Sequence, residues 1–103
     1  MPRDVRVAGV SEIPPGSSKR VKLAKGDVAV FNVAGKFVAC KDECPHQMVS
    51  LTGGSLEGDV MTCPGHAWKF DLGRSGRCVS GDTELSLRMF PVKVVAGEVY
   101  VET

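Results

Sequence analysis

The chain contains two histidines, and each lies within three residues of a cysteine. Residues 44–46 read Cys-Pro-His and residues 63–66 read Cys-Pro-Gly-His, with residues 47–62 between them. Thiolate and imidazole are soft-to-borderline ligands, which proteins use for metals such as zinc, copper and iron. Two such pairs in two tight segments therefore indicate a metal site. Its candidate ligands are Cys44, His46, Cys63 and His66.

The distribution of cysteine and histidine between the two segments distinguishes two kinds of metal site. Structural zinc sites usually take two cysteines from one segment and two histidines from the other. Here each segment supplies one donor of each type, which suits two metal ions side by side, because each segment can then reach both ions. A [2Fe–2S] cluster with two cysteine and two histidine ligands has this donor set. A structural zinc-binding module with the same four ligands remains the alternative.

The residues around these segments resemble the Rieske-type ferredoxins, which are components of multicomponent aromatic-ring oxygenases. The similarity rests on CPHQ at 44–47, SLEGDVMTCPGHAWKFD at 55–71 and FPVKV at 90–94, and it covers roughly Phe31 to Val101. It implies one Rieske [2Fe–2S] cluster per chain. It also implies that Cys44 and Cys63 hold the inner iron, and His46 and His66 the outer iron.

The ligand set bears on the reduction potential. Replacing two thiolates by neutral imidazoles removes two negative charges, so the centre accepts an electron more easily. Rieske centres accordingly lie at about −150 to +300 mV, against about −400 mV for plant-type ferredoxins. High-potential members of the family have an extra cysteine in each ligand segment. The corresponding positions here, near Val49 and Gly65, contain no cysteine, which implies the low-potential, ferredoxin-like class.

The composition limits the class of protein. The 103 residues fit a single domain, 1–103, and a net charge of +1 with interspersed signs gives no reason to expect a nucleic-acid partner. No long apolar run or leader is visible, so we expect no membrane association and a cytoplasmic location. The spacing of the four cysteines does not match an all-cysteine cluster, which would also leave the histidines unexplained. Cys40 and Cys78 are therefore predicted to be buried apolar residues.

Many short alternating segments separated by glycine, proline and serine predict an all-β fold, a Rieske-like antiparallel β-sandwich or barrel. The expected strands are 4–10, 19–24, 28–33, 36–40, 60–62, 68–72, 77–80, 90–96 and 98–102. Two hairpins are predicted, with turns at 34–35 and 96–97. Residues 51–59 read as loop. The ligand segments are expected in a small cluster-binding insertion or subdomain, about 42–80.

The function implied by the resemblance is electron transfer. The chain would take one electron from a flavoprotein NAD(P)H reductase and pass it to a terminal oxygenase, which is an aromatic-ring mono- or dioxygenase. We expect no catalytic site, because a non-haem iron would need further histidines that the chain lacks, and we expect a monomer. The small Rieske subunit of a nitrite reductase is the alternative.

Trp68 is expected either on a docking face or in the core. Lys69, Arg74 and Arg77 are candidate docking charges, while Gln47 and Met48 would form an uncharged tip.

Overall fold

The computed structural model describes residues 4–23, 26–43, 50–64, 68–74, 76–79 and 86–102. Within these ranges all paired strands are antiparallel, and the helical structure consists of two 3-10 turns, η1 (Val10–Glu12) and η2 (Leu72–Arg74). The predicted all-β antiparallel fold is confirmed. In the described part of the chain, no helix has the length and apolar character needed to cross a membrane.

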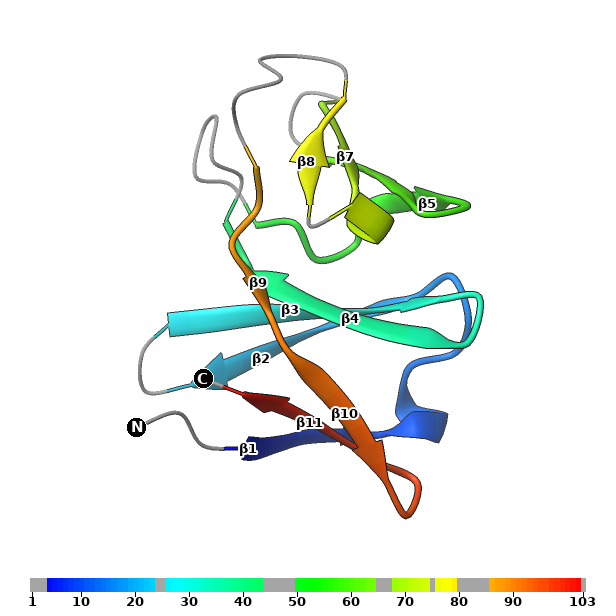
Figure 1. Ribbon diagram of the computed structural model, residues 1–103, viewed down its shortest axis with the longest axis vertical. Helices are drawn as coiled ribbons and strands as arrows, with labels where there is room; N and C mark the ends of the chain where they lie inside the picture. The colour runs from blue at the N-terminus through cyan, green and yellow to red at the C-terminus, as the bar shows by residue number, and fades with distance from the viewer. Residues whose placement is uncertain are drawn as a thin grey trace.

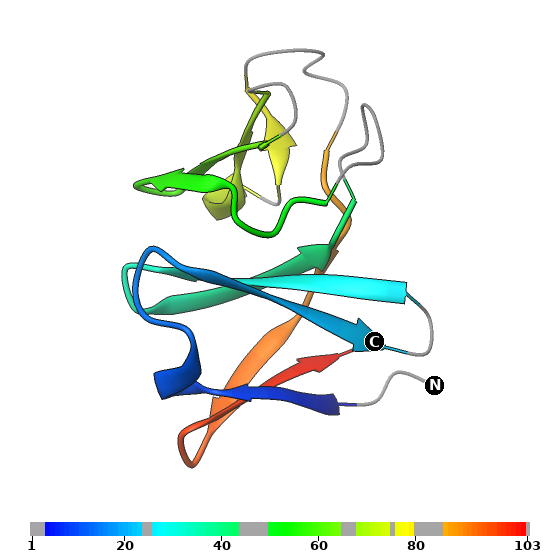
Figure 2. The same ribbon diagram turned by 180° about the vertical axis from the view of Figure 1, so that it is seen from behind.

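The strands form three sheets stacked as layers (Figures 1 and 2). The terminal sheet has the order β1-β11-β10, the central sheet β2-β3-β4-β9, and the distal sheet β5-β6-β7-β8. The strand bounds are β1 (Asp4–Gly9), β2 (Ser18–Leu23), β3 (Gly26–Val33), β4 (Lys36–Lys41), β5 (Ser55–Glu57), β6 (Val60–Thr62), β7 (Lys69–Asp71), β8 (Arg77–Cys78), β9 (Met89–Phe90), β10 (Val92–Val95) and β11 (Glu98–Glu102).

Strand β3 is buried on both faces because the central sheet lies between the other two. Successive side chains of a strand point to opposite faces. Val28 and Val30 belong to the hydrophobic cluster shared with the terminal sheet. Ala29 and Phe31 belong to the second cluster, which is shared with the distal sheet. The continuous apolar run of β3 thus supplies both cores, and the distal sheet is fixed by packing against the central one.

The predicted hairpin turns are confirmed at both positions. Ala34 and Gly35 join β3 to β4 with φ angles of 52° and 96°, and Ala96 and Gly97 join β10 to β11 with φ angles of 51° and 77°. Two consecutive residues with positive φ are typical of the tight turns that match the right-handed twist of a hairpin. Asn32 supports the first turn, since its buried side chain accepts a hydrogen bond from Gly35 N–H at 2.7 Å.

Several predicted element boundaries were wrong. The segment 90–96 is not one strand, because Pro91 separates β9, which pairs with β4, from β10, which pairs with β11. The segment 55–57 was expected to be loop but forms β5, paired with β6. The first strand gives way to a 3-10 turn at Val10, and the strand expected over 68–72 ends at Asp71.

The two cysteines outside the predicted ligand set are buried, as predicted. Cys40 and Cys78 are 0% and 1% exposed, and both lie in the hydrophobic cluster between the central and distal sheets. Burial, with a smaller contribution from the Asp42 carboxylate, raises the pKa of the Cys40 thiol from 9.0 to about 12. A thiol that stays protonated at neutral pH is a poor metal ligand, since metals bind the thiolate.

The raised pKa of Cys40 predicts an alkaline loss of stability. The folded state favours the neutral thiol, so its stabilising contribution is complete below pH 9 and is lost as the pH rises from 9.0 toward about 12. We expect the thermal unfolding midpoint of the wild-type chain to fall more steeply over this window than that of Cys40→Ala. Parallel curves for the two proteins would contradict a titrating, buried Cys40.

Candidate metal centre

The structure describes one of the four predicted ligands, Cys63. The other three, Cys44, His46 and His66, lie outside the described residues. Cys63 directly follows β6, and its residue is 1% exposed. It belongs to the hydrophobic cluster between the central and distal sheets. The position of the Cys63 side chain is thus set by the packing of this cluster.

A backbone hydrogen bond closes the segment that follows Cys63. The Cys63 N–H donates to the carbonyl of Trp68 at 2.7 Å. This bond extends the pairing of β6 with β7 by one residue beyond Thr62 and Lys69. The bond thus brings Cys63 and Trp68, the residues on either side of 64–67, next to each other. The predicted ligand His66 itself lies outside the described residues.

Trp68 is half-buried and packs against the same hydrophobic cluster as Cys63. The core interpretation of Trp68 is therefore confirmed by its contacts, whereas a docking role stays a prediction.

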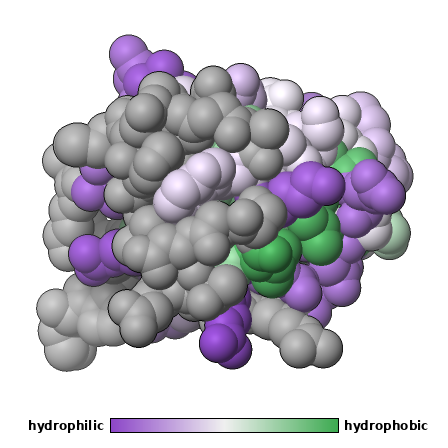
Figure 3. Space-filling model, turned by 90° about the horizontal axis from the view of Figure 1, so that it is seen from above, coloured by the Kyte–Doolittle hydropathy of each residue, from purple (hydrophilic) through white to green (hydrophobic). Residues whose placement is uncertain are grey.

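Lys69 and Arg77 are exposed on β7 and β8. Figure 3 looks onto this end of the molecule, where hydrophobic residues gather beside hydrophilic ones. Val79, which follows β8, is 46% exposed and donates its N–H to the carbonyl of Lys69.

The base of the other ligand segment is held by Asp42, which follows β4 and is 8% exposed. Its carboxylate accepts hydrogen bonds from the N–H groups of Leu51 and Thr52 at 2.8 and 2.9 Å. It also accepts from the hydroxyls of Ser50 and Thr52 at 2.8 and 3.0 Å. Asp42 therefore fixes residues 50–52 next to the end of β4. Sequence reasoning missed this residue, because its partners are eight to ten positions away and form no local motif.

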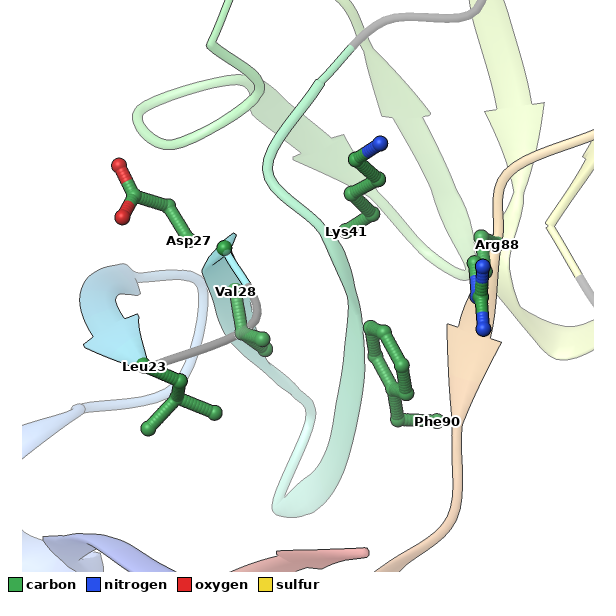
Figure 4. Close-up of a pocket in the computed structure, with 7 residues that line it drawn as sticks. Leu23, Asp27, Val28, Lys41, Arg88 and Phe90 are labelled. Atoms are coloured by element: carbon green, nitrogen blue, oxygen red, sulfur yellow. The ribbon is translucent and has the colours of Figure 1, made fainter. Parts of the chain in front are cut away.

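Arg20 balances the charge of Asp42. Its Nε lies 3.3 Å from the Asp42 carboxylate, and its guanidinium also donates to Asp27. Asp27 turns its carboxylate away from a hollow of about 230 Å³ whose wall includes Val28 and Phe90 (Figure 4). The described residues that line this hollow include no cluster of metal donors. Among the charged residues described at this end of the central sheet, Arg20 is the one that forms an ion pair with Asp42, and Asp27 in turn orients Arg20.

Gly54 allows residues 50–54 to approach strand β6 closely. A Cβ at this position would lie 2.7 Å from the Met61 sulfur, 2.7 Å from the Thr62 carbonyl oxygen and 3.1 Å from the Leu51 carbonyl oxygen. Two of these atoms are backbone atoms, which cannot rotate away. Gly54, in the part of the chain that follows the first ligand segment, thus packs directly on β6, the strand that precedes Cys63.

Within the described residues, no three cysteine, histidine or acidic side chains gather in a way that could hold a metal ion. The donor that is described nevertheless fits a metal-bound thiolate. Cys63 is a buried cysteine at the base of a loop, beside a chain segment fixed by Asp42. Cys40 and Cys78 are equally buried but lie within strands β4 and β8, whereas Cys63 follows the end of β6. A metal ion bound there would offset the cost of burying the Cys63 thiolate.

The close contact at Gly54 predicts that Gly54→Ala both lowers the stability of the protein and changes the fluorescence of Trp68. We expect a loss of about 1–3 kcal/mol of stability, because the added methyl overfills a closed contact. The movement of β6 should also change the fluorescence of Trp68, which is the single tryptophan of the chain. Gly58→Ala is the matched control on the same hairpin. It introduces strain at a positive φ but meets no atom within 4 Å, so it should leave the fluorescence unchanged. The same emission change in both variants would argue against the contact.

Comparison with known proteins identifies relatives over nearly the whole chain. Ferredoxin CarAc of Metapseudomonas resinovorans is 37% identical over 98 residues, which cover 94% of this chain and 91% of the relative. The biphenyl dioxygenase ferredoxin subunit of Pseudomonas sp. (strain KKS102) is also 37% identical over 98 residues, covering 94% of this chain and 89% of the relative. These names confirm the resemblance to ferredoxin components of oxygenase systems, which are electron carriers rather than the catalytic oxygenases.

Solved structures lead to the same family. A chain in the complex of reduced oxygenase and oxidized ferredoxin of carbazole 1,9a-dioxygenase is 36% identical, with a TM-score of 0.86, covering 95% of this chain and 91% of that chain. The family model described as Rieske [2Fe-2S] domain matches residues 3–91. With the fold, the buried Cys63 and these relatives taken together, the chain belongs to the Rieske [2Fe-2S] domain family.

Proposed function

We propose that this chain is an electron-transfer ferredoxin that carries one electron on a Rieske [2Fe–2S] cluster from a flavoprotein NAD(P)H reductase to a terminal aromatic-ring oxygenase. The observation that carries the proposal is the placement of Cys63, a buried cysteine directly after β6 whose N–H donates to the carbonyl of Trp68. Relatives of matching length that are ferredoxins of dioxygenase systems support it. They favour a dioxygenase partner over a monooxygenase or a nitrite reductase.

The proposed ligands are Cys44 and Cys63 on the inner iron, and His46 and His66 on the outer iron. When bound, the cluster accepts and releases one electron, and its two imidazoles place its potential above that of an all-cysteine cluster. Cys63 would supply its thiolate from the core side, where apolar neighbours exclude water. His66, three residues after Cys63, would supply its imidazole at the rim of the site. We also propose that residues 42–80 form the cluster-binding unit of a single domain.

The chain offers matched controls for the ligand assignment. Cys40, Cys63 and Cys78 are all buried to within 1%, so replacing any of them by alanine removes a buried sulfur. We expect Cys63→Ala and Cys44→Ala to lose bound iron, while Cys40→Ala and Cys78→Ala keep two irons and two labile sulfides per chain. Chemical analysis of iron and sulfide measures this directly.

The wild-type protein should be red-brown, and its reduced form should give an electron paramagnetic resonance signal with a lower average g value than an all-cysteine cluster. His66→Cys should lower the reduction potential, since it adds a negative charge to the ligand set. A colourless wild-type chain with one zinc ion would overturn the proposal. So would retention of the full iron content in Cys63→Ala.

The partner assignment is tested by reconstitution with carbazole dioxygenase components. We expect the purified chain to be reduced by NADH only when a flavoprotein ferredoxin reductase is present, and then to support product formation by the oxygenase. Cys63→Ala should abolish this transfer, because it removes a cluster ligand. A reductase-dependent reduction of the chain without any transfer to aromatic-ring oxygenases would leave the carrier role standing and refute the oxygenase partner.

A further inference from the structure

Asp42 places a buried negative charge beside a predicted ligand segment. Its side chain is 0% exposed, and a buried carboxylate is costly unless hydrogen bonds and a counter-charge compensate it. Four hydrogen bonds reach it from Ser50, Leu51 and Thr52. The Arg20 guanidinium, which is itself oriented by Asp27, supplies the positive charge. Because all these interactions are made together, the Asp42 side chain is fixed in one conformation, and it fixes the residues bonded to it as well.

The partners of Asp42 link the two ligand segments. Asp42 precedes the first ligand segment and residues 50–52 follow it, so the bonds of Asp42 join the chain on the two sides of that segment. The Leu51 carbonyl accepts the Gly54 N–H at 3.0 Å, and Gly54 lies against Thr62, the residue before Cys63. Gly53 N–H donates to Ser18 Oγ at 2.8 Å, which ties the same turn to β2. A continuous chain of contacts therefore runs from Asp42 to Cys63.

We propose that Asp42 is a positioning residue for the metal centre, which sets the distance between the two ligand segments through Ser50, Leu51 and Thr52. The inference rests on the proposed function. In this proposal Asp42 does not bind the metal. It acts by holding the backbone on the two sides of the first ligand segment. Residues that orient ligands in this way typically change metal affinity by about 10-fold to 100-fold when they are replaced.

The test compares Asp42→Ala with Asp42→Asn in the cluster-loaded protein. Asparagine keeps an oxygen that can accept the N–H groups of Leu51 and Thr52, whereas alanine loses every bond. In the presence of an iron chelator, we expect Asp42→Ala to lose its visible absorbance about 10-fold to 100-fold faster than the wild type, with Asp42→Asn in between. Asp4→Asn is the matched control, since Asp4 pairs with Lys93 in the terminal sheet, away from both segments.

The reduction potential and the g values of the reduced protein together distinguish a positioning role of Asp42 from an effect of its charge alone. Both Asp42 variants remove one negative charge, so both should raise the reduction potential. A change in the g values of the reduced protein is expected for Asp42→Ala and to a smaller extent for Asp42→Asn, because only a displaced ligand segment alters the geometry of the iron pair. Equal g values in all proteins, together with iron loss at the wild-type rate, would overturn the inference.

A second set of variants keeps the inference testable if Asp42→Ala does not fold. The double variant Ser50→Ala, Thr52→Val removes the two hydroxyl donors and leaves the buried carboxylate with its backbone bonds and Arg20. We expect it to lose iron several-fold faster than the wild type, while Thr52→Ser, which keeps its hydroxyl, behaves like the wild type. Wild-type behaviour of the double variant would contradict the role of Asp42. A wild-type chain that holds no iron would instead refute the proposed function.

Discussion

The packing of the distal sheet on the central sheet is the interaction on which the candidate centre depends. Phe31 of β3, Leu51, Met61 and Cys63 share one hydrophobic cluster. Because these side chains are almost fully buried, a shift of either sheet would open a cavity, which costs about 24 cal/mol per Å³. Cys63 is thus fixed by the same burial that holds the layers together. The Cys63 N–H donates to the carbonyl of Trp68, so Trp68 is held beside Cys63 in that position.

Electrostatics adds a second constraint at the other ligand segment. There the chain leaves β4 and returns at residue 50, where no ladder of strand hydrogen bonds is available. The buried carboxylate of Asp42 takes the place of a strand partner, since it accepts two backbone N–H groups and two hydroxyls. Arg20 lowers the cost of burying this charge. The two segments are therefore held by different forces, apolar burial for one and a satisfied charge for the other.

Much of the fold followed from local patterns, and the exceptions were long-range. The run Val28–Val33 was predicted as a strand from its β-branched residues, and the turns at 34–35 and 96–97 from glycine. Strand β5 was missed because two of its three residues are polar and it lies among glycines, and it forms by pairing with β6. Pro91 was included in a strand, although it lacks the N–H that a ladder needs. The candidate metal donors were proposed from residue type and spacing. Asp42 was not found, because its hydrogen bonds are to residues 50–52, eight to ten positions along the chain.

The central claim is that two imidazoles and two thiolates bind one iron pair, with sulfur on the core side and nitrogen at the rim. Electron–nuclear double resonance on reduced protein labelled with ¹⁵N-histidine tests it most directly, since the chain has only two histidines. We predict strong hyperfine couplings to two histidine nitrogens, one of which disappears in His66→Cys. Couplings that are absent, or that persist unchanged in that variant, would contradict the assignment.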